Sequence, residues 1–273
     1  MRTLLIFALL PLSVHGQLEW RSEEPSPVAF AKAGQNVLTA FSNSTNTEVD
    51  VELSTRIFLL SSATAVPLGE ARPWKRLKVL PGQTILEKLT VDFPDVKVPT
   101  RFRIQCIKGT SDKIGQLDVT AYPDNLLKSL QTLADGKPVG ILDPGHLLIP
   151  LLKQQKVEFE ELKGSEDLDH FKGRLAVLGP FGSADQIPAG LESTAVGCAK
   201  SGRAIVWIEP ASRKLSLAPS ARVSVFSAGT VVAAQAGTVS SPSDSPTAQL
   251  NLVRLCEMAI DPARFQWPAP PIP

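Results

Sequence analysis

Residues 173–180 are Gly-Arg-Leu-Ala-Val-Leu-Gly-Pro, and residues 204–210 are Ala-Ile-Val-Trp-Ile-Glu-Pro. Each stretch holds a short, continuous apolar run that ends at a glycine or a proline. Two further runs of this kind lie at 138–142 and 230–234. Continuous apolar runs are typical of strands buried on both faces, and helical patterns alternate with these runs. The second half of the chain is therefore predicted to form a parallel sheet covered by helices.

The helical patterns between the runs have recognisable starts and ends. A stretch at 125–134 places Leu126, Leu130 and Leu133 on one face and is followed by Gly136. The other predicted helices are 147–155 with Pro150 in its opening turn, one that starts at a Ser183–Gln186 capping box and ends at Gly202, and a last one that opens at Ser245-Pro246.

The first half of the chain has a different period. Between 17 and 122 apolar and polar residues alternate, which is typical of strands with one buried and one wet face. In the clearest case Phe102, Ile104 and Cys106 alternate with Arg101 and Arg103. Turn residues separate about seven such runs. We predict two packed antiparallel sheets in an immunoglobulin-like β-sandwich.

Trp20 and Trp74 have two interpretations in such a sandwich. They either form an exposed sugar-binding face or pack against the core or the neighbouring domain, and we favour packing. The three cysteines, Cys106, Cys198 and Cys256, are odd in number and widely spaced, unlike a disulfide framework or a metal knuckle. All three are predicted to be buried apolar residues, with a single Cys198–Cys256 bridge left open.

Residues 1–16 have the features of a secretory signal peptide: Arg2, an apolar run and small residues near Gly16. We expect a mature protein from Gln17 that is extracytoplasmic, periplasmic or secreted. A cysteine for lipid attachment is absent at the junction, and no later run is long enough to anchor the chain in a membrane. The predicted divisions are 1–16 (signal peptide), 17–122 (immunoglobulin-like sandwich), 123–262 (α/β domain) and 263–273 (Pro-rich tail, disordered or docked on a partner).

The composition is that of a globular protein with a formal net charge of +1. Such a balance, without a basic stripe, argues against nucleic acid as a partner. No motif for a metal or a cofactor is recognised, so we expect neither.

The region from about 125 to 259 resembles the class I glutamine amidotransferase-like superfamily. The likeness is carried by the two opening stretches and by the helix between them, which ends Ala-Lys-Ser-Gly-Arg at 199–203. It is nearest to non-enzymatic extracytoplasmic members, and it implies a flavodoxin-like α/β domain. The resemblance also implies a cysteine on the turn after a central strand, with a histidine and a glutamate after a later strand.

The sequence departs from that family pattern. The matching turn after Leu178 is Gly-Pro-Phe-Gly-Ser and has no cysteine. His146 and His170 both precede the turn, so Ser183 has no downstream histidine as a base and is better explained as a helix cap. We therefore predict that no residue is catalytic and that the protein is not an enzyme.

A ligand of this domain is expected beyond the carboxyl ends of the parallel strands. Three residues that follow the predicted strands also have possible structural roles. Asp143 can be explained as a helix cap, His146 as a turn residue and Glu209 as a solvent-exposed strand end. The acidic cluster Asp167, Asp169 and His170 either binds a cation or belongs to a solvated loop at 164–169, which we favour. The predicted ligand-binding residues are Asp143, His146, Gly179, Phe181, Ser183 and Glu209.

The function that follows is a non-enzymatic binding or assembly protein of the cell envelope, with a protein partner and with a small ligand or glycan as a further option. The alternatives are a hydrolase that uses Asp143, His146 and Glu209 at the rim, and a carbohydrate-binding protein that uses exposed tryptophans. The serine-rich segment 240–246 is predicted to be a flexible surface loop.

Overall fold

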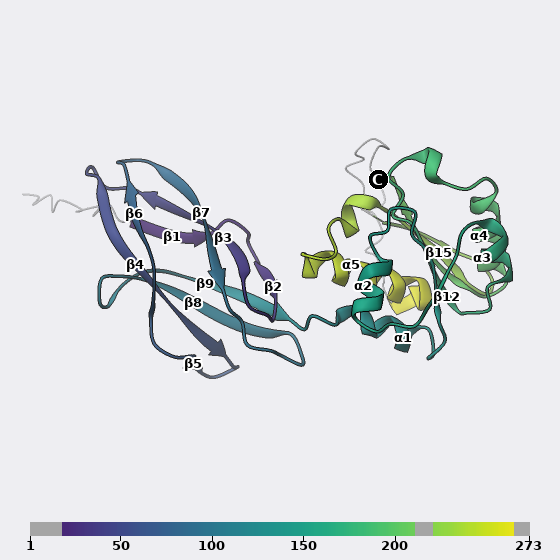
Figure 1. The fold of residues 1–273 in the computed structure, drawn as a ribbon, viewed down its shortest axis with the longest axis horizontal. Coiled ribbons are helices and arrows are strands. Elements are labelled where there is room, and N and C mark those ends of the chain that lie inside the picture. The colour runs from purple at the N-terminus through teal and green to yellow at the C-terminus, as the bar shows by residue number, and fades with distance from the viewer. Residues whose placement is uncertain (1–17, 211–220, 265–273) are drawn as a thin grey trace, which may run out of the picture. The chain divides into compact units, whose positions relative to one another are not determined.

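The computed structural model describes residues 18–210 and 221–264. Contacts divide the chain into two compact units, with the boundary between Ala121 and Tyr122 (Figure 1). The predicted signal peptide and residues 265–273 of the predicted tail lie outside the described residues. In the described part of the chain, no helix has the length and apolar character needed to cross a membrane.

The described residues of the first unit form nine strands. Hydrogen bonds join them in the order β5-β4-β8-β9-β1-β3-β7, with β2 on β9 and β6 on β4. The strands are β1 (Leu18–Ser22), β2 (Val28–Phe30), β3 (Gln35–Asn43), β4 (Val49–Leu60), β5 (Ala65–Pro67), β6 (Arg72–Val79), β7 (Thr84–Val91), β8 (Thr100–Lys108) and β9 (Asp112–Tyr122).

Two packed antiparallel sheets were predicted for this unit, whereas hydrogen bonds join its strands into one set that includes a parallel pair. The 12-residue strand β4 pairs with β6 along its first half and with β5 and β8 along its second half, so it connects β6 to β5 and β8. β9 is connected to β1 through one parallel pair, Trp20–Gly115. A Cβ at Gly115 would lie 2.4 Å from the Trp20 carbonyl oxygen, so only glycine permits this approach.

The core of the first unit follows the predicted alternation. Phe102, Ile104 and Cys106 of β8 are fully buried. Trp20 is 4% exposed and lies 6.2 Å from Phe41 between ring centroids. Trp74 is half-buried and packs on the same two rings, so the two tryptophans contribute to the core.

The second unit contains a six-stranded sheet in the order β11-β10-β12-β13-β15-β14. Its strands are parallel except β14, which runs antiparallel to β15 at one edge. The four predicted apolar runs form β10, β12, β13 and β15. The strands are β10 (Val139–Leu142), β11 (Phe159–Glu161), β12 (Leu175–Leu178), β13 (Ala204–Glu209), β14 (Ala221–Val225) and β15 (Thr230–Gln235).

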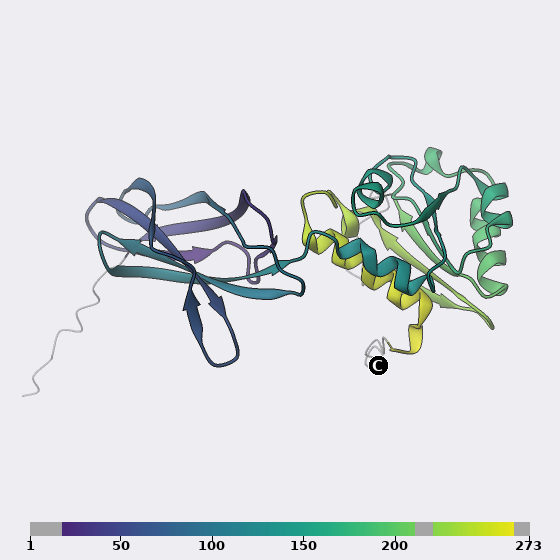
Figure 2. The ribbon, with the colours of Figure 1, turned by 60° about the horizontal axis from the view of Figure 1, so that its bottom comes forward.

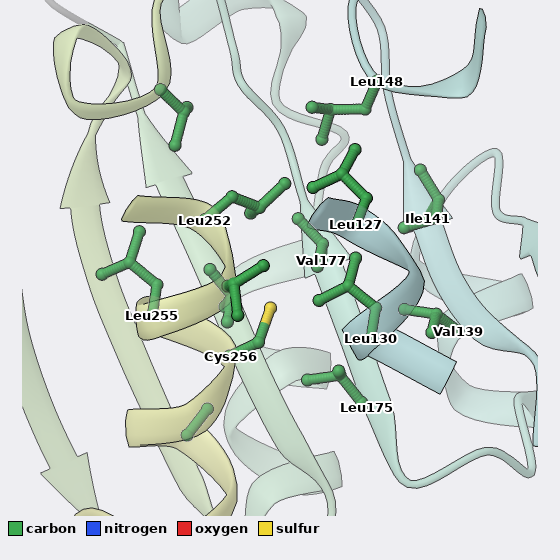
Figure 3. Packing of buried hydrophobic residues seen from close by; sticks show 14 of the residues in the cluster. Leu127, Leu130, Val139, Ile141, Leu148, Leu175, Val177, Leu252, Leu255 and Cys256 are labelled. Carbon is green, nitrogen blue, oxygen red and sulfur yellow. The ribbon is translucent and has the colours of Figure 1, made fainter. Parts of the chain in front are cut away.

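Helices cover both faces of this sheet. α1, α2 and α5 pack on one face, where Leu127, Leu130 and Cys256 meet Val139 and Val177 (Figure 3). α3 and α4 pack on the other face. The helical segments are η1 (Leu126–Lys128), α1 (Ser129–Leu133), α2 (Ile149–Gln154), α3 (Ser165–His170), η2 (Ala184–Gln186), α4 (Leu191–Lys200), η3 (Ala236–Val239), α5 (Pro246–Ile260) and η4 (Pro262–Arg264).

Several helix predictions need correction. The segment predicted as a helix at 125–134 is a 3₁₀ turn followed by a short α-helix. It buries Leu127, Leu130 and Ala134 fully, whereas Leu126 and Leu133 are only partly buried. A 3₁₀ turn has three residues, so it places Leu127 on the same side as Leu130. The segment predicted as a loop at 164–169 is α3.

All three cysteines are buried and free. Cys198 lies on the face covered by α3 and α4, whereas Cys256 lies on the face covered by α5. Because the sheet separates them, the structure contains no Cys198–Cys256 bridge. Burial raises the pKa of Cys106 to about 12 and also raises the pKa of the other two thiols, although Arg203 partly opposes the shift at Cys198.

Candidate functional site

A cleft of about 630 Å³ lies at the carboxyl ends of the parallel strands. It is bounded by the loops that follow β10, β12 and β15, and by the start of α2. After β10 the chain goes to β11 on one side and then to β12 on the other, so the strand order reverses between β10 and β12. Ligands of open α/β sheets bind at such a reversal. The lining residues are Gly145, His146, Leu147, Pro150, Leu151, Pro180, Phe181, Gly182, Gln186, Ala236, Gly237, Val239, Ser240, Ser241, Pro242 and Ser243.

Asp143 follows β10 and is only 5% exposed. Its Oδ1 accepts a hydrogen bond from the Leu147 amide at 3.0 Å, and its Oδ2 accepts from the amides of Leu148 at 2.7 Å and Ile149 at 2.9 Å. These amides belong to the start of α2, where backbone donors lack partners inside the helix. The carboxylate is therefore a helix cap, and it does not line the cleft.

The turn after β12 is shaped by the glycine that the sequence places there. Gly179 has φ of +98°, and a Cβ on it would lie 2.6 Å from the Ile208 carbonyl oxygen. Phe181 then turns inward, is fully buried and packs on Trp207 with 5.4 Å between ring centroids. Gly179 positions this turn but is not part of the cleft lining, whereas Phe181 is.

Ser183 and Gln186 do not form the predicted capping box. The Ser183 side chain makes no capping hydrogen bond, and Gln186 Oε1 accepts one from the Gly182 amide at 2.6 Å. The residues that follow Ser183 form the 3₁₀ turn η2, which ends at Gln186, and α4 begins only after Gly190 with φ of +76°. The glutamine, which sequence reasoning used only as a cap, therefore fixes the cleft wall and lines it.

Glu209 ends β13 and forms an ion pair with Arg222 of β14. Its side chain is 13% exposed, so it does not end free in solvent as one interpretation held. In β13 the alternation places Ile208 on the α5 face and Trp207 on the α4 face. Glu209 shares the parity of Trp207, so it lies on the opposite side from the cleft wall that α2 provides.

His146 is exposed, has φ of +51° and lines the cleft. Of the six predicted residues, the structure thus brings only His146 and Phe181 to the cleft. His146 is also the only ionisable side chain among the described lining residues. Within the described residues no group of three His, Cys, Asp or Glu side chains could hold a metal ion, and this includes the cluster at 167–170.

The third wall, Ser240 to Ser243, was predicted to be a flexible loop, and its anchoring was missed. Pro242 is buried, and its carbonyl oxygen accepts a hydrogen bond from Gln249 Nε2 at 2.8 Å. Gln249 Oε1 accepts from Gln155 Nε2 at 3.1 Å, and Gln155 Oε1 accepts from the Leu127 amide at 2.9 Å. A glutamine on the apolar stripe of the last helix was the signal that could have revealed this anchor.

No protein-family model matches the chain, and no curated protein matches it. Solved structures that resemble part of it include a β-glucosidase from Kluyveromyces marxianus, at 9% identity and a TM-score of 0.29, over 39% of this chain and 14% of that chain. A β-glucosidase from Listeria innocua in complex with glucose is 12% identical with a TM-score of 0.27, over 40% of this chain and 17% of that chain. The chain thus spans less than a fifth of the length of these enzymes, and likenesses of this degree carry no argument about its activity.

Proposed function

We propose that this protein is a non-catalytic binding protein that takes its ligand in the cleft between the loops after β10, β12 and β15. The observation that carries the proposal is the cleft itself, which lies at the reversal of strand order. Its described lining holds no carboxylate, thiol or amine, and His146 is the one ionisable side chain there. A general base without a partner group makes a poor catalytic site.

The proposal includes the finer fold assignments. The five parallel strands follow the order 2-1-3-4-5, which is the flavodoxin-like order and is in keeping with an amidotransferase-like domain. The first unit is proposed to be an immunoglobulin-like sandwich, which its predominantly antiparallel pairing supports. At the turn where active relatives of the proposed superfamily carry a cysteine, this chain has the buried Phe181.

The ligand we propose is an apolar segment of a protein partner in the cell envelope, outside the cytoplasm. The side chains of the lining are mostly aliphatic or proline, and Leu147 is 47% exposed there. Exposed apolar surface inside a concavity is typical of recognition sites. The serine hydroxyls at 240, 241 and 243 add hydrogen-bonding groups at one wall.

The rim hydrolase is less well supported than binding. It needs Asp143, His146 and Glu209 close to one reacting atom. Asp143 accepts hydrogen bonds from three backbone amides, and Glu209 forms an ion pair with Arg222. Neither carboxylate lines the cleft.

The test compares two exposed serines of the same unit. One variant carries a photo-crosslinking amino acid at position 243 in the cleft, and a second variant carries it at position 224 on β14. Each variant is expressed in the source organism and crosslinked in its cell envelope. A partner that crosslinks only from position 243 is then purified, and its affinity is measured for the wild type, Ser243→Trp and Ser224→Trp. We expect Ser243→Trp to weaken binding at least roughly tenfold, since an indole fills the cleft, and Ser224→Trp to leave it unchanged.

Two results would contradict the proposal. One is equal crosslinking from both positions, or equal affinity of both tryptophan variants. The other is chemical turnover of the bound partner that His146→Ala abolishes, because this would establish the hydrolase instead.

A further inference from the structure

The first unit has a groove of its own, at the turn between β4 and β5. Its volume is about 660 Å³, which is within the usual range of roughly 300–1,000 Å³ for ligand pockets. The hairpin of β4 and β5 projects from the rest of the sheet (Figure 2), and the first residues of β8 form the other wall. The lining residues are Leu60, Ser61, Ser62, Ala63, Thr64, Ala65, Pro99, Thr100, Arg101 and Arg103.

Two arginines and no acidic residue line this groove. Arg101 and Arg103 share one face of β8 because the residues between and after them, Phe102 and Ile104, point into the core. Their common counter-ion is Asp118, which lies opposite Arg103 on β9. Among the described residues, one carboxylate thus faces two guanidinium groups, which leaves one positive charge uncompensated.

The two arginines contact Asp118 in different ways. Arg103 donates to Asp118 through Nε at 2.7 Å and Nη2 at 2.9 Å, a two-point contact that fixes both groups. Arg101 donates to Asp118 through Nη2 alone, at 3.1 Å, and its side chain is 66% exposed. Of its five N–H groups, only this one is used among the described residues, so the others remain available to a ligand in the groove that Arg101 lines.

Asp118 keeps this arrangement in place at neutral pH. The hydrogen bond from Arg103 lowers the pKa of the carboxyl group, and the charges of both arginines act in the same direction. The carboxylate therefore stays ionised, and Arg101 is held beside the groove before any ligand arrives. A positioned donor costs less ordering on binding than a free side chain does.

Hydroxyl groups form the rest of the polar lining. The turn at the hairpin tip is closed by the Ser61 amide, which donates to the Thr64 carbonyl oxygen at 2.9 Å. A further contact of 2.9 Å joins the Ser61 and Thr64 hydroxyl oxygens, and Thr100 lies across the groove. Hydroxyls both donate and accept, which matches the hydroxyl groups of a sugar ring.

We propose that this groove binds an acidic sugar, with its carboxylate on Arg101 and its ring hydroxyls on the Ser and Thr side chains. The charge balance selects this class, because one uncompensated positive charge matches a monovalent carboxylate. A phosphate group would bring a charge of about −1.5 to −2 and leave part of it uncompensated. The proposal is independent of the cleft in the second unit, and its failure would leave the function proposed above intact.

The experiment is a calorimetric titration of the full chain at low ionic strength with three probes: galacturonate, which has one carboxylate, the uncharged galactose and inorganic phosphate. We expect galacturonate to bind, and its affinity to fall as salt is added, since exposed charges are screened. Arg101→Gln should weaken this binding roughly tenfold, the amount expected for the loss of one charge-assisted hydrogen bond. The matched control is Arg72→Gln, which removes an arginine of the same unit that is 78% exposed and lies 4.0 Å from its partner Asp92.

Arg101→Lys separates charge from geometry. A lysine keeps the charge but loses the planar fork, so it should retain part of the affinity. Any of three results would overturn the proposal: no binding of galacturonate, equal binding of galactose, or the same affinity in Arg101→Gln as in the wild type. If phosphate binds through Arg101 and galacturonate does not, the groove recognises a phosphorylated ligand and the acidic sugar is wrong.

Discussion

Replacing Asp143 by alanine should destabilise the second unit far more than its single, small side chain suggests. The carboxylate accepts hydrogen bonds from three successive amides at the start of α2. Leu147 is 47% exposed, so its amide can turn to water when the carboxylate is removed. Leu148 is fully buried and Ile149 is 6% exposed, so their amides would be left without a partner.

The size of the effect can be built from these contacts. Loss of a helix N-cap costs about 0.5–2 kcal/mol, and a buried donor without an acceptor costs about 1–3 kcal/mol. These terms overlap, because the same amides enter both, and together they give about 3 kcal/mol for Asp143→Ala. Asp143→Asn keeps one oxygen for the two buried amides and loses the charge, so about 1–1.5 kcal/mol is expected.

Hydrogen exchange followed by mass spectrometry measures the loss of stability in each unit separately. Amides of the buried strands β12 and β13 should exchange roughly 100-fold faster in Asp143→Ala and roughly tenfold faster in Asp143→Asn, while β8 of the first unit stays unchanged. Asp185→Ala is the control, because Asp185 is exposed and lies in the same unit. If Asp143→Ala accelerates exchange less than about threefold, the capping role is wrong, and Asp143 becomes available again for chemistry at the rim.

Three further predictions concern packing, charge and the thiols. Gly115→Ala should destabilise the first unit by more than about 2 kcal/mol, because the added Cβ would clash with the Trp20 carbonyl oxygen. Gly197→Ala has open space on α4 and should stabilise the second unit by up to about 1 kcal/mol. Thermal unfolding with a separate transition for each unit measures both effects. Asp118→Asn should cost the first unit about 1 kcal/mol at pH 7 through the lost contact with Arg103. Because that contact lowers the pKa of Asp118 in the folded state below its ordinary 3.8, the stabilisation is fully present above pH 3.8. In urea titrations the difference from the variant should disappear as the pH falls through the lowered pKa of the folded state. The three buried thiols should resist iodoacetamide in the native protein at pH 8 and react fully in urea, and a fast native reaction would contradict their burial.

The sequence predicts the second sheet well because its four central strands are apolar on both faces. Such runs have no other stable place than the middle of a covered sheet. The two strands that were missed, β11 and β14, lie at the edges and have three and five residues, most of them exposed or half-buried. A short polar strand at an edge leaves no apolar signature in the sequence.

Prediction of the site fails at the level of side-chain direction. The rule for carboxyl ends identifies the correct edge of the sheet, because it depends on topology alone. Whether a residue enters the cleft depends on the strand parity and on the following turn, and these separate Phe181, which lines the cleft, from Glu209, which does not. Asp143 was assigned two roles, and the choice between them depends on where the amides of α2 begin, which the sequence leaves uncertain by several residues.

The buried glutamine pair explains how a serine-rich loop becomes a wall of the cleft. Gln249 holds the Pro242 carbonyl, and through Gln155 it is tied to the Leu127 amide at the start of the second unit. A side-chain amide in an apolar environment must have its partners, so this chain of hydrogen bonds fixes the loop against both α2 and α5. The loop after β12 is fixed in its turn by the buried ring of Phe181 and by Gln186. With these walls fixed by buried contacts, the cleft exists before a ligand arrives, and a partner that fits it gains affinity because little of the protein has to be ordered on binding.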